Sequence, residues 1–156
     1  MVAKVGRCAK AVKGGRKFTF SVLSIAGDGK GKVGIGLGKA AEVADARDKA
    51  DQNARRNMIR VPLRDNRTLH HDIEVKFCSG RVKMRAAPPG TGIIAGGAVR
   101  VLCEVLGIKD VVIKSVASTN PHNMVKAAMS GLKKIKSLRY IAEKRGKKIG
   151  DIVGLS

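Results

Sequence analysis

The residues that could do chemistry in this chain are concentrated between positions 13 and 39. In that stretch, KGGRKFTFSVLSIAGDGKGKVGIGLGK, basic residues and glycines recur, and Asp28 is the only acid. Lysine and arginine offer positive charge to phosphate, and glycine, which has no Cβ, lets a backbone come close to it. The chemistry that this stretch predicts is therefore the binding of a phosphate backbone, as in nucleic acid.

Two glycine motifs could instead belong to a nucleotide-using enzyme. Residues 29–34 read GxGxxG, but a dinucleotide site places that motif between a strand and a helix, and here a strand follows it. Residues 90–95 fit the variant that ends in alanine and precede a helix, with Asp110 at a tolerable distance for a ribose-binding acid. The chain has no room for paired βαβ halves, and the preceding strands are predicted to form a hairpin. Chain reversal and helix entry therefore explain these glycines, and RNA or protein could in addition approach Gly96 and Gly97.

No catalytic or metal-binding pattern is present in the sequence. It contains no GxxxxGK[ST], HExxH or GxSxG motif, and its histidines and cysteines lack metal-ligand spacing. Most of the acids in the first half fall on one predicted helix, where they face solvent and match the helix dipole. We therefore expect no enzymatic activity, no cofactor and no metal.

Composition limits the class of protein. The 156 residues are 44% hydrophobic, which is typical of a folded chain, and the net charge of +20 favours a polyanionic partner. We expect no membrane span and no signal peptide, and the three scattered cysteines favour a reducing compartment such as the cytoplasm. Phe18 and Phe20 could form a stacking platform or part of the core. Only 3% of residues are aromatic, which favours recognition of structured RNA by shape and phosphate.

The elements that position the basic stretch are predicted as an antiparallel sheet and one helix. Alternation around Phe20 predicts one strand, residues 27–31 a turn, and residues 33–38 a second strand; residues 5–12 could supply a third. The second strand has an apolar face and a glycine face, and we expect the glycine face (Gly34, Gly36 and Gly38) to be open to close approach. A helix over residues 41–60 would cover the sheet.

The second half predicts an α+β module. Strands are expected at 71–77, 81–87 and 111–117, and helices at 97–106, ending at Gly107, and at 121–135. The basic tail, 138–156, is expected to be partly helical. A change in charge balance near Asp65 predicts two domains, residues 1–66 and 67–156.

Several motifs of this sequence resemble one family. They are Val12-Lys13-Gly14-Gly15-Arg16, residues 27–40 with their alternating glycines, Ala54-Arg55-Arg56-Asn57-Met58-Ile59, residues 90–97 and Ser118-Thr119-Asn120-Pro121-x-Asn123. In order and spacing the chain resembles bacterial ribosomal protein five of the small subunit. It differs by lacking the longer N-terminal extension that is often present, and by Ala44 and Ala86 where proline is common.

The resemblance implies a fold and a function. The fold is an N-terminal domain similar to a double-stranded-RNA-binding domain, antiparallel sheet plus helix, and a C-terminal βαβα-type domain. The function is a structural constituent of the small ribosomal subunit that binds its rRNA, stabilises the head relative to the body, and contributes to translational accuracy and the mRNA entry path. Small-subunit proteins four and eight would be neighbours, in a cytoplasmic or organellar ribosome, and no homo-oligomer is expected.

The candidate RNA-binding residues combine the basic side chains with four glycines that would give close backbone approach. They are Lys13, Gly14, Gly15, Arg16, Lys17, Gly29, Lys30, Gly31, Lys32, Lys39, Arg55, Arg56 and Arg60. The basic residues 126–148 could touch RNA, touch a protein neighbour or be solvated. Two rival functions remain: a free-standing double-stranded-RNA chaperone, and an enzyme built around the loop at Gly90.

Overall fold

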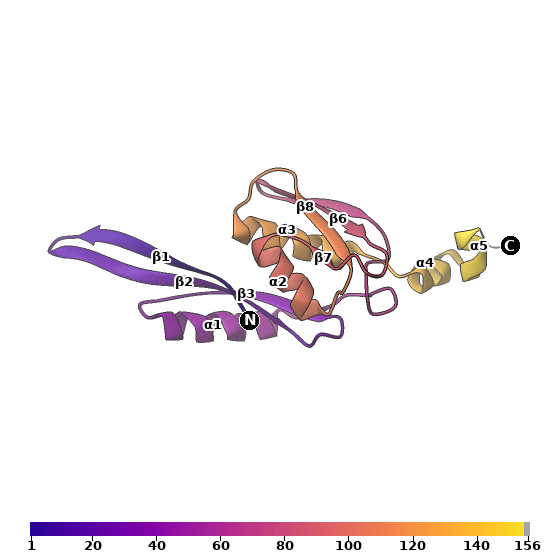
Figure 1. Cartoon of the computed structure of the whole chain (residues 1–156). Coiled ribbons are helices and arrows are strands. Elements are labelled where there is room, and N and C mark those ends of the chain that lie inside the picture. The colour runs from indigo at the N-terminus through magenta and orange to yellow at the C-terminus, as the bar shows by residue number, and fades with distance from the viewer. Residues whose placement is uncertain (155–156) are drawn as a thin grey trace.

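The first half of the chain folds as an antiparallel sheet with a helix on one face (Figure 1). The computed structural model describes residues 1–154. The elements are β1 (Val2–Val12), β2 (Gly15–Gly27), β3 (Lys32–Ala40), α1 (Val43–Arg56) and β4 (Ile59–Arg60), and the sheet order is β1-β2-β3-β4. The three predicted strands are confirmed. The helix is shorter than expected, because the chain turns after Asn57 and Arg60 pairs with Lys32 in a strand.

The glycine face of β3 is covered by α1. The buried residues of the helix are Ala46, Ala50 and Ala54, and a Cβ on Gly36 would collide with the backbone of α1 at Ala50 and Ala54. Gly34 and Gly38 are closed off by the same helix. The expectation that this face is open to close approach is therefore wrong. Alanine on the helix and glycine on the strand let the two backbones come closer than larger side chains would allow.

The second half is a second sheet with helices on one side (Figure 1). Its elements are β5 (Ile73–Phe77), β6 (Gly80–Ala86), β7 (Ile93–Ile94), α2 (Gly97–Leu106), β8 (Val111–Ser115), α3 (Pro121–Lys134), α4 (Leu138–Arg145) and α5 (Ile149–Val153). The sheet order is β5-β6-β8-β7, and the short β7, which was not predicted, runs parallel to β8. The predicted stop at Gly107 is confirmed by its φ of 93°. The mixed α+β class is confirmed.

One apolar core joins the two halves. Leu23 and Ile25 of β2 and Val33 of β3 belong to the same buried cluster as Leu102 and Leu106 of α2. The apolar face of the first sheet therefore packs against the second half, while its glycine face holds α1. The proposed domain boundary lies in a tight turn at Asp65 and Asn66, where both residues have positive φ; the division into domains 1–66 and 67–156 stays a prediction.

The β1–β2 hairpin extends beyond the helix as a two-stranded arm, residues 7–20 (Figure 1). Ala40, the last residue of β3, pairs with Phe20, so only β1 and β2 continue outward from that point. Nearly all side chains of the arm are exposed. An unsupported two-stranded ribbon has little stability of its own in water, so this arm is suited to lying against another molecule.

Candidate nucleic-acid interface

The tip of the arm presents charge and bare backbone together. Lys13, Gly14, Gly15 and Arg16 are all exposed, and the two glycines have φ of 97° and 147°. A Cβ at either glycine would meet nothing within 4 Å. The turn thus needs glycine for its backbone conformation, and it also leaves space at which a phosphate could reach the backbone.

Like charges face each other just behind the tip. Lys10 of β1 and Lys17 of β2 are direct cross-strand partners. Such a pair is destabilising unless an anion lies between or beside the two ammonium groups. Because α1 does not reach this part of the arm, an external polyanion could relieve the repulsion.

The two phenylalanines of β2 differ in environment. Phe20 packs against the cluster of Val22, Ala46 and Ala50, so it serves the core. Phe18 is 41% exposed, and the guanidinium carbon of Arg7 lies 4.4 Å from its ring centroid. One face of the only exposed ring on the arm is therefore already covered by a cation, which argues against a two-ring stacking platform.

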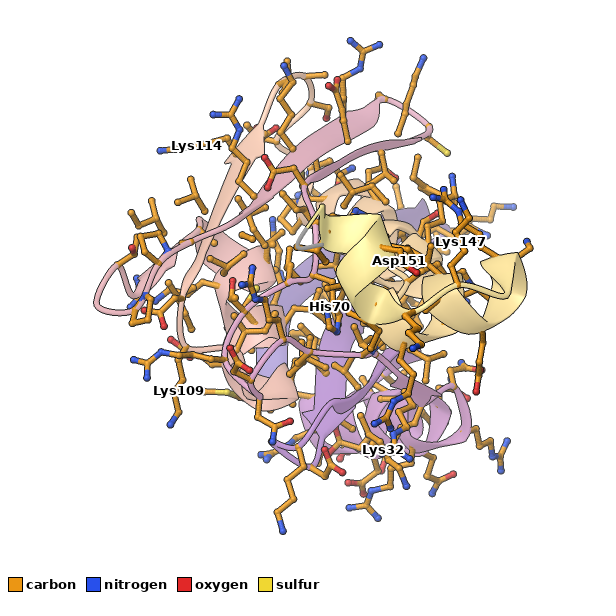
Figure 2. All side chains as sticks on the ribbon, turned by 90° about the vertical axis from the view of Figure 1, so that its right-hand side faces the viewer. Lys32, His70, Lys109, Lys114, Lys147 and Asp151 are labelled. Carbon is orange, nitrogen blue, oxygen red and sulfur yellow. The ribbon has the colours of Figure 1, made fainter. Side chains whose placement is uncertain are left out.

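A second basic group lies at the opposite end of β2. Lys30 lies in the β2–β3 turn and Lys32 begins β3. Arg60 is paired with Lys32 in the sheet, and Arg55 and Arg56 end the helix beside them. All five are exposed. Figure 2 views the end of the molecule opposite to the arm, with Lys32 in its lower part.

The single acid of the basic stretch organises this turn. Asp28 Oδ1 accepts hydrogen bonds from the backbone N–H groups of Lys30 and Lys32, at 2.8 and 3.0 Å. These bonds lower the pKa of the Asp28 carboxyl, with the bond from Lys30 as the largest cause. The carboxylate thus fixes the turn from which both lysine side chains project.

The predicted site is divided by the length of the sheet. β2 has 13 residues, and at about 3.3 Å per residue its two ends lie roughly 40 Å apart. The arm tip and Lys17 are at one end, the group around Lys32 at the other, and Lys39 lies between them opposite Ser21. The sequence stretch that looked like one phosphate-binding hairpin is therefore two separate basic surfaces.

Two of the predicted glycines face the second half of the chain. The N–H of Gly29 donates to Val105 O at 3.0 Å, and that of Gly31 donates to Leu106 O at 3.1 Å. Gly31 is buried, and a Cβ on Gly107 would collide with Gly29. RNA was expected to come close to the backbone at Gly29 and Gly31. In the structure, the C-terminal end of α2 lies there.

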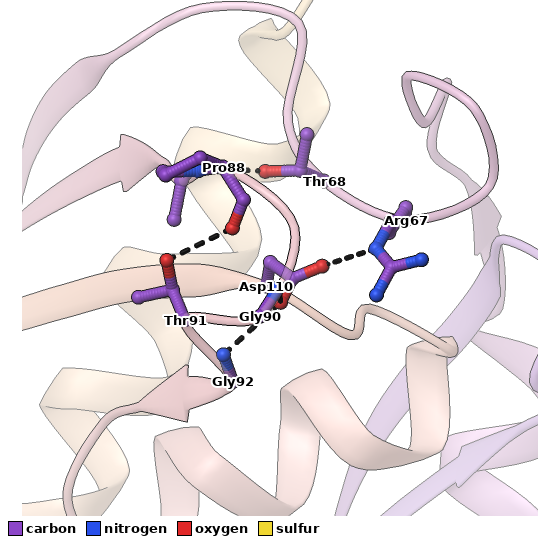
Figure 3. A network of polar contacts seen from close by, with 8 residues as sticks. Arg67, Thr68, Pro88, Gly90, Thr91, Gly92 and Asp110 are labelled. Carbon is purple, nitrogen blue, oxygen red and sulfur yellow. Dashed lines mark hydrogen bonds and ion pairs between the residues drawn. The ribbon is translucent and has the colours of Figure 1, made fainter.

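The loop at Gly90 is held by a buried carboxylate (Figure 3). Asp110 is 2% exposed, and its Oδ1 accepts from the N–H groups of Gly90 and Gly92 at 3.1 and 3.0 Å. Its Oδ2 accepts from Nε of Arg67 at 2.5 Å. These hydrogen bonds lower the pKa of Asp110, with that from Gly92 as the largest cause. The carboxylate is engaged within the protein and is not free to bind a ribose. Its partner Arg67 is not among the residues predicted from the sequence.

The remaining reactive groups form no site. Cys8 and Cys78 are exposed and Cys103 is buried, where loss of solvation raises the pKa of the Cys103 thiol to about 12. Within residues 1–154 no cluster of three metal-ligating side chains occurs. Among the helices of that same range, none is long and apolar enough to cross a bilayer.

Comparison with known proteins assigns both halves to one family. Residues 1–62 match the model of the ribosomal protein S5 N-terminal domain, and residues 75–145 match that of the ribosomal protein S5 C-terminal domain. The chain is 56% identical over 153 residues to the small ribosomal subunit protein uS5 of Ehrlichia ruminantium, covering 98% of this chain and 88% of the relative. It is 57% identical over 150 residues to that of Caulobacter vibrioides, covering 96% of this chain and 75% of the relative.

Proposed function

This chain belongs to the ribosomal protein S5 family, and on that premise we propose how it works in the small ribosomal subunit. It is a structural, non-enzymatic constituent of the subunit and binds small-subunit rRNA. Its place is the bacterial-type ribosome of the cytoplasm. The proposal concerns which residues hold the RNA and what that contact achieves.

The observation that carries the proposal is the separation of two exposed basic surfaces by the length of β2. The arm tip, with Lys13 and Arg16, would hold one rRNA element, and the group around Lys32 would hold another. Lys39 would contact the backbone between them. α1 on one face and the shared core on the other would hold the sheet between residues 20 and 32. The arm beyond it would be ordered by its own RNA contact, so that the bound protein would set the distance between the two RNA elements.

A protein that bridges two RNA elements in this way suits a role in particle geometry. We propose that the protein stabilises the head of the subunit relative to its body and thereby contributes to translational accuracy. The resemblance adds small-subunit proteins four and eight as neighbours and a position near the mRNA entry path. Lysine and arginine side chains in contact with phosphates would supply most of the affinity. Each contact releases counterions from the RNA, and this release favours binding.

The test of this proposal is sedimentation of the native chain through a gradient, at low salt and after a high-salt wash. A component built into the particle should stay with the small subunit through the wash. A chain that remains at the top of the gradient, or binds any RNA duplex as well as rRNA, would support the free-standing duplex chaperone instead.

A matched pair of variants tests the two-surface arrangement. Particles that carry Lys13→Ala with Arg16→Ala, and particles that carry Arg55→Ala with Arg56→Ala, should show changed rRNA protection in two different segments. Protection lost in one common segment for both pairs would contradict the bridging role.

A further inference from the structure

A groove lies at the junction of the two halves, outside the surfaces described above. It has a volume of about 870 Å³, which lies within the range of ligand sites. One wall is the β3 edge with the end of α1, and the other is α3. Its floor is apolar and includes Leu37, Met58 and Phe77.

Charge in the groove has one sign. α3 contributes Lys126 and Lys133, while the α1 wall contributes the amides of Asn53 and Asn57, and no acid is among the lining residues. The Nζ of Lys126 lies 5.5 Å from the ring centroid of Phe77, so one cation is held directly above the floor. One turn earlier on α3, burial lowers the pKa of His122, with Lys4 and Lys126 as smaller causes, so this side chain adds no positive charge at neutral pH.

The edge of β3 in the groove is unsuited to adding a protein strand. β4 covers β3 only at Lys32 and Val33, which leaves the following residues as an open edge. However, Nδ2 of Asn53 donates to Leu37 O at 2.8 Å and takes up the carbonyl that an added strand would need. A ladder of backbone hydrogen bonds along this edge is therefore interrupted at its centre.

We propose that this groove binds an unpaired nucleotide of small-subunit rRNA. The base lies on the apolar floor at Leu37 and Met58, since Lys126 already covers the ring of Phe77, and the flanking phosphates meet Lys126 and Lys133. Proteins hold single-stranded nucleic acid by combining a basic groove with a platform for the base. The platform is usually aromatic, and here it is aliphatic, with Lys126 and Lys133 as the basic rim. The inference rests on the proposed rRNA-binding function and adds to it a third contact, which comes from both halves of the chain.

The test measures binding of the full chain to protein-free small-subunit rRNA as a function of salt. Two lost phosphate contacts to a single strand lower the slope of log affinity against log salt by about 1.4. The variant Lys126→Ala with Lys133→Ala should show this smaller slope. The ratio of wild-type affinity to variant affinity should therefore fall about sevenfold between 50 and 200 mM salt. Lys76→Ala with Lys109→Ala removes the same charge at exposed positions outside the groove and should keep the wild-type slope.

The floor is tested by a neutral variant. Leu37 is 39% exposed, so Leu37→Ser should fold, and it should weaken rRNA binding severalfold without changing the salt slope. An unchanged slope for the double lysine variant, together with unchanged affinity for Leu37→Ser, would overturn the groove proposal while leaving rRNA binding by the arm intact. If wild type itself fails to bind rRNA, the proposed function fails with it.

The identity of the occupant is tested by tethered cleavage. Ser130 lines the groove, and Ser130→Cys, with Cys8 and Cys78 changed to serine, places one reactive thiol there in an assembled particle. A radical-generating reagent tethered to that thiol should cut the rRNA backbone at one short unpaired segment. Cleavage confined to a protein neighbour, or to a fully paired helix, would overturn the proposal.

Discussion

Replacing Gly36 by alanine should destabilise the fold without removing an RNA contact. The new Cβ would lie 2.9 Å from the carbonyl carbon of Asn53, where ordinary contacts are 3.4–4 Å, and it would meet Ala50 O and Ala54 N more closely still. These obstacles are backbone atoms. The contact with Asn53 alone requires a shift of about 0.5 Å, and α1 must move by more than that because Ala50 O and Ala54 N are closer. Overpacking of this kind costs about 1–3 kcal/mol, and a rigid neighbour favours the upper end.

A loss of about 3 kcal/mol in a chain of this size lowers the melting temperature by roughly 6–12 °C. Thermal denaturation followed by circular dichroism, without RNA, measures it. Gly6→Ala is the matched control, because its Cβ meets the movable Ser21 Oγ at 3.2 Å and the Ser21 backbone oxygen at an ordinary 4.0 Å. It should melt close to wild type.

The result that would refute this reasoning is a Gly36→Ala chain that melts within about 1 °C of wild type. If that chain also lost affinity for rRNA, the glycine face would be an RNA surface and not the seat of α1. Binding measured well below the melting temperature separates the two effects.

Four further outcomes are expected. Lys13→Ala with Arg16→Ala should leave the melting temperature unchanged. It should lower the slope of log affinity for rRNA against log salt by about 1.8, because two phosphate contacts to a double-stranded segment are lost; an unchanged slope would remove the arm tip from the interface. Because folding lowers the pKa of Asp110, its contribution to stability is present above the ordinary carboxyl pKa and is lost as pH falls below about 4. Melting temperatures between pH 7 and 3 should therefore fall less steeply for Asp110→Asn than for wild type, and equal slopes would contradict this. A thiol reagent should label the two exposed cysteines of the native chain and reach Cys103 only on unfolding; labelling of all three at one rate would show that the α2 packing is wrong. Ile25→Ala should cost about 2–5 kcal/mol and still give one unfolding transition, since the core is shared; two separate transitions would show that the halves fold independently.

The sequence was sufficient for most of the secondary structure. Alternation around Phe20 and Val33 located the long strands, and Gly107 marked the end of α2, because these signals depend on neighbours within a few residues. The short strands β4 and β7 were not predicted. Two-residue strands carry no periodicity, and only their partners in the sheet define them.

The candidate site was predicted in composition but not in arrangement. The basic residues between Lys13 and Lys39 are as exposed as their type suggests, yet the strand between them separates the two ends. Arg67 and the groove at Lys126 gave no signal, since their partners Asp110 and Phe77 lie over 40 positions away in the chain.

The sequence by itself determined the chemistry: excess positive charge, glycine where the backbone turns, and motifs specific enough to identify the family. Only the tertiary structure decided what each glycine is for. At Gly14 the missing Cβ leaves the backbone open, at Gly27 it admits Val105 of the second half, and at Gly36 it admits α1. The physical reason is that a missing Cβ permits close approach by any partner, and the folded chain alone shows which partner occupies the space.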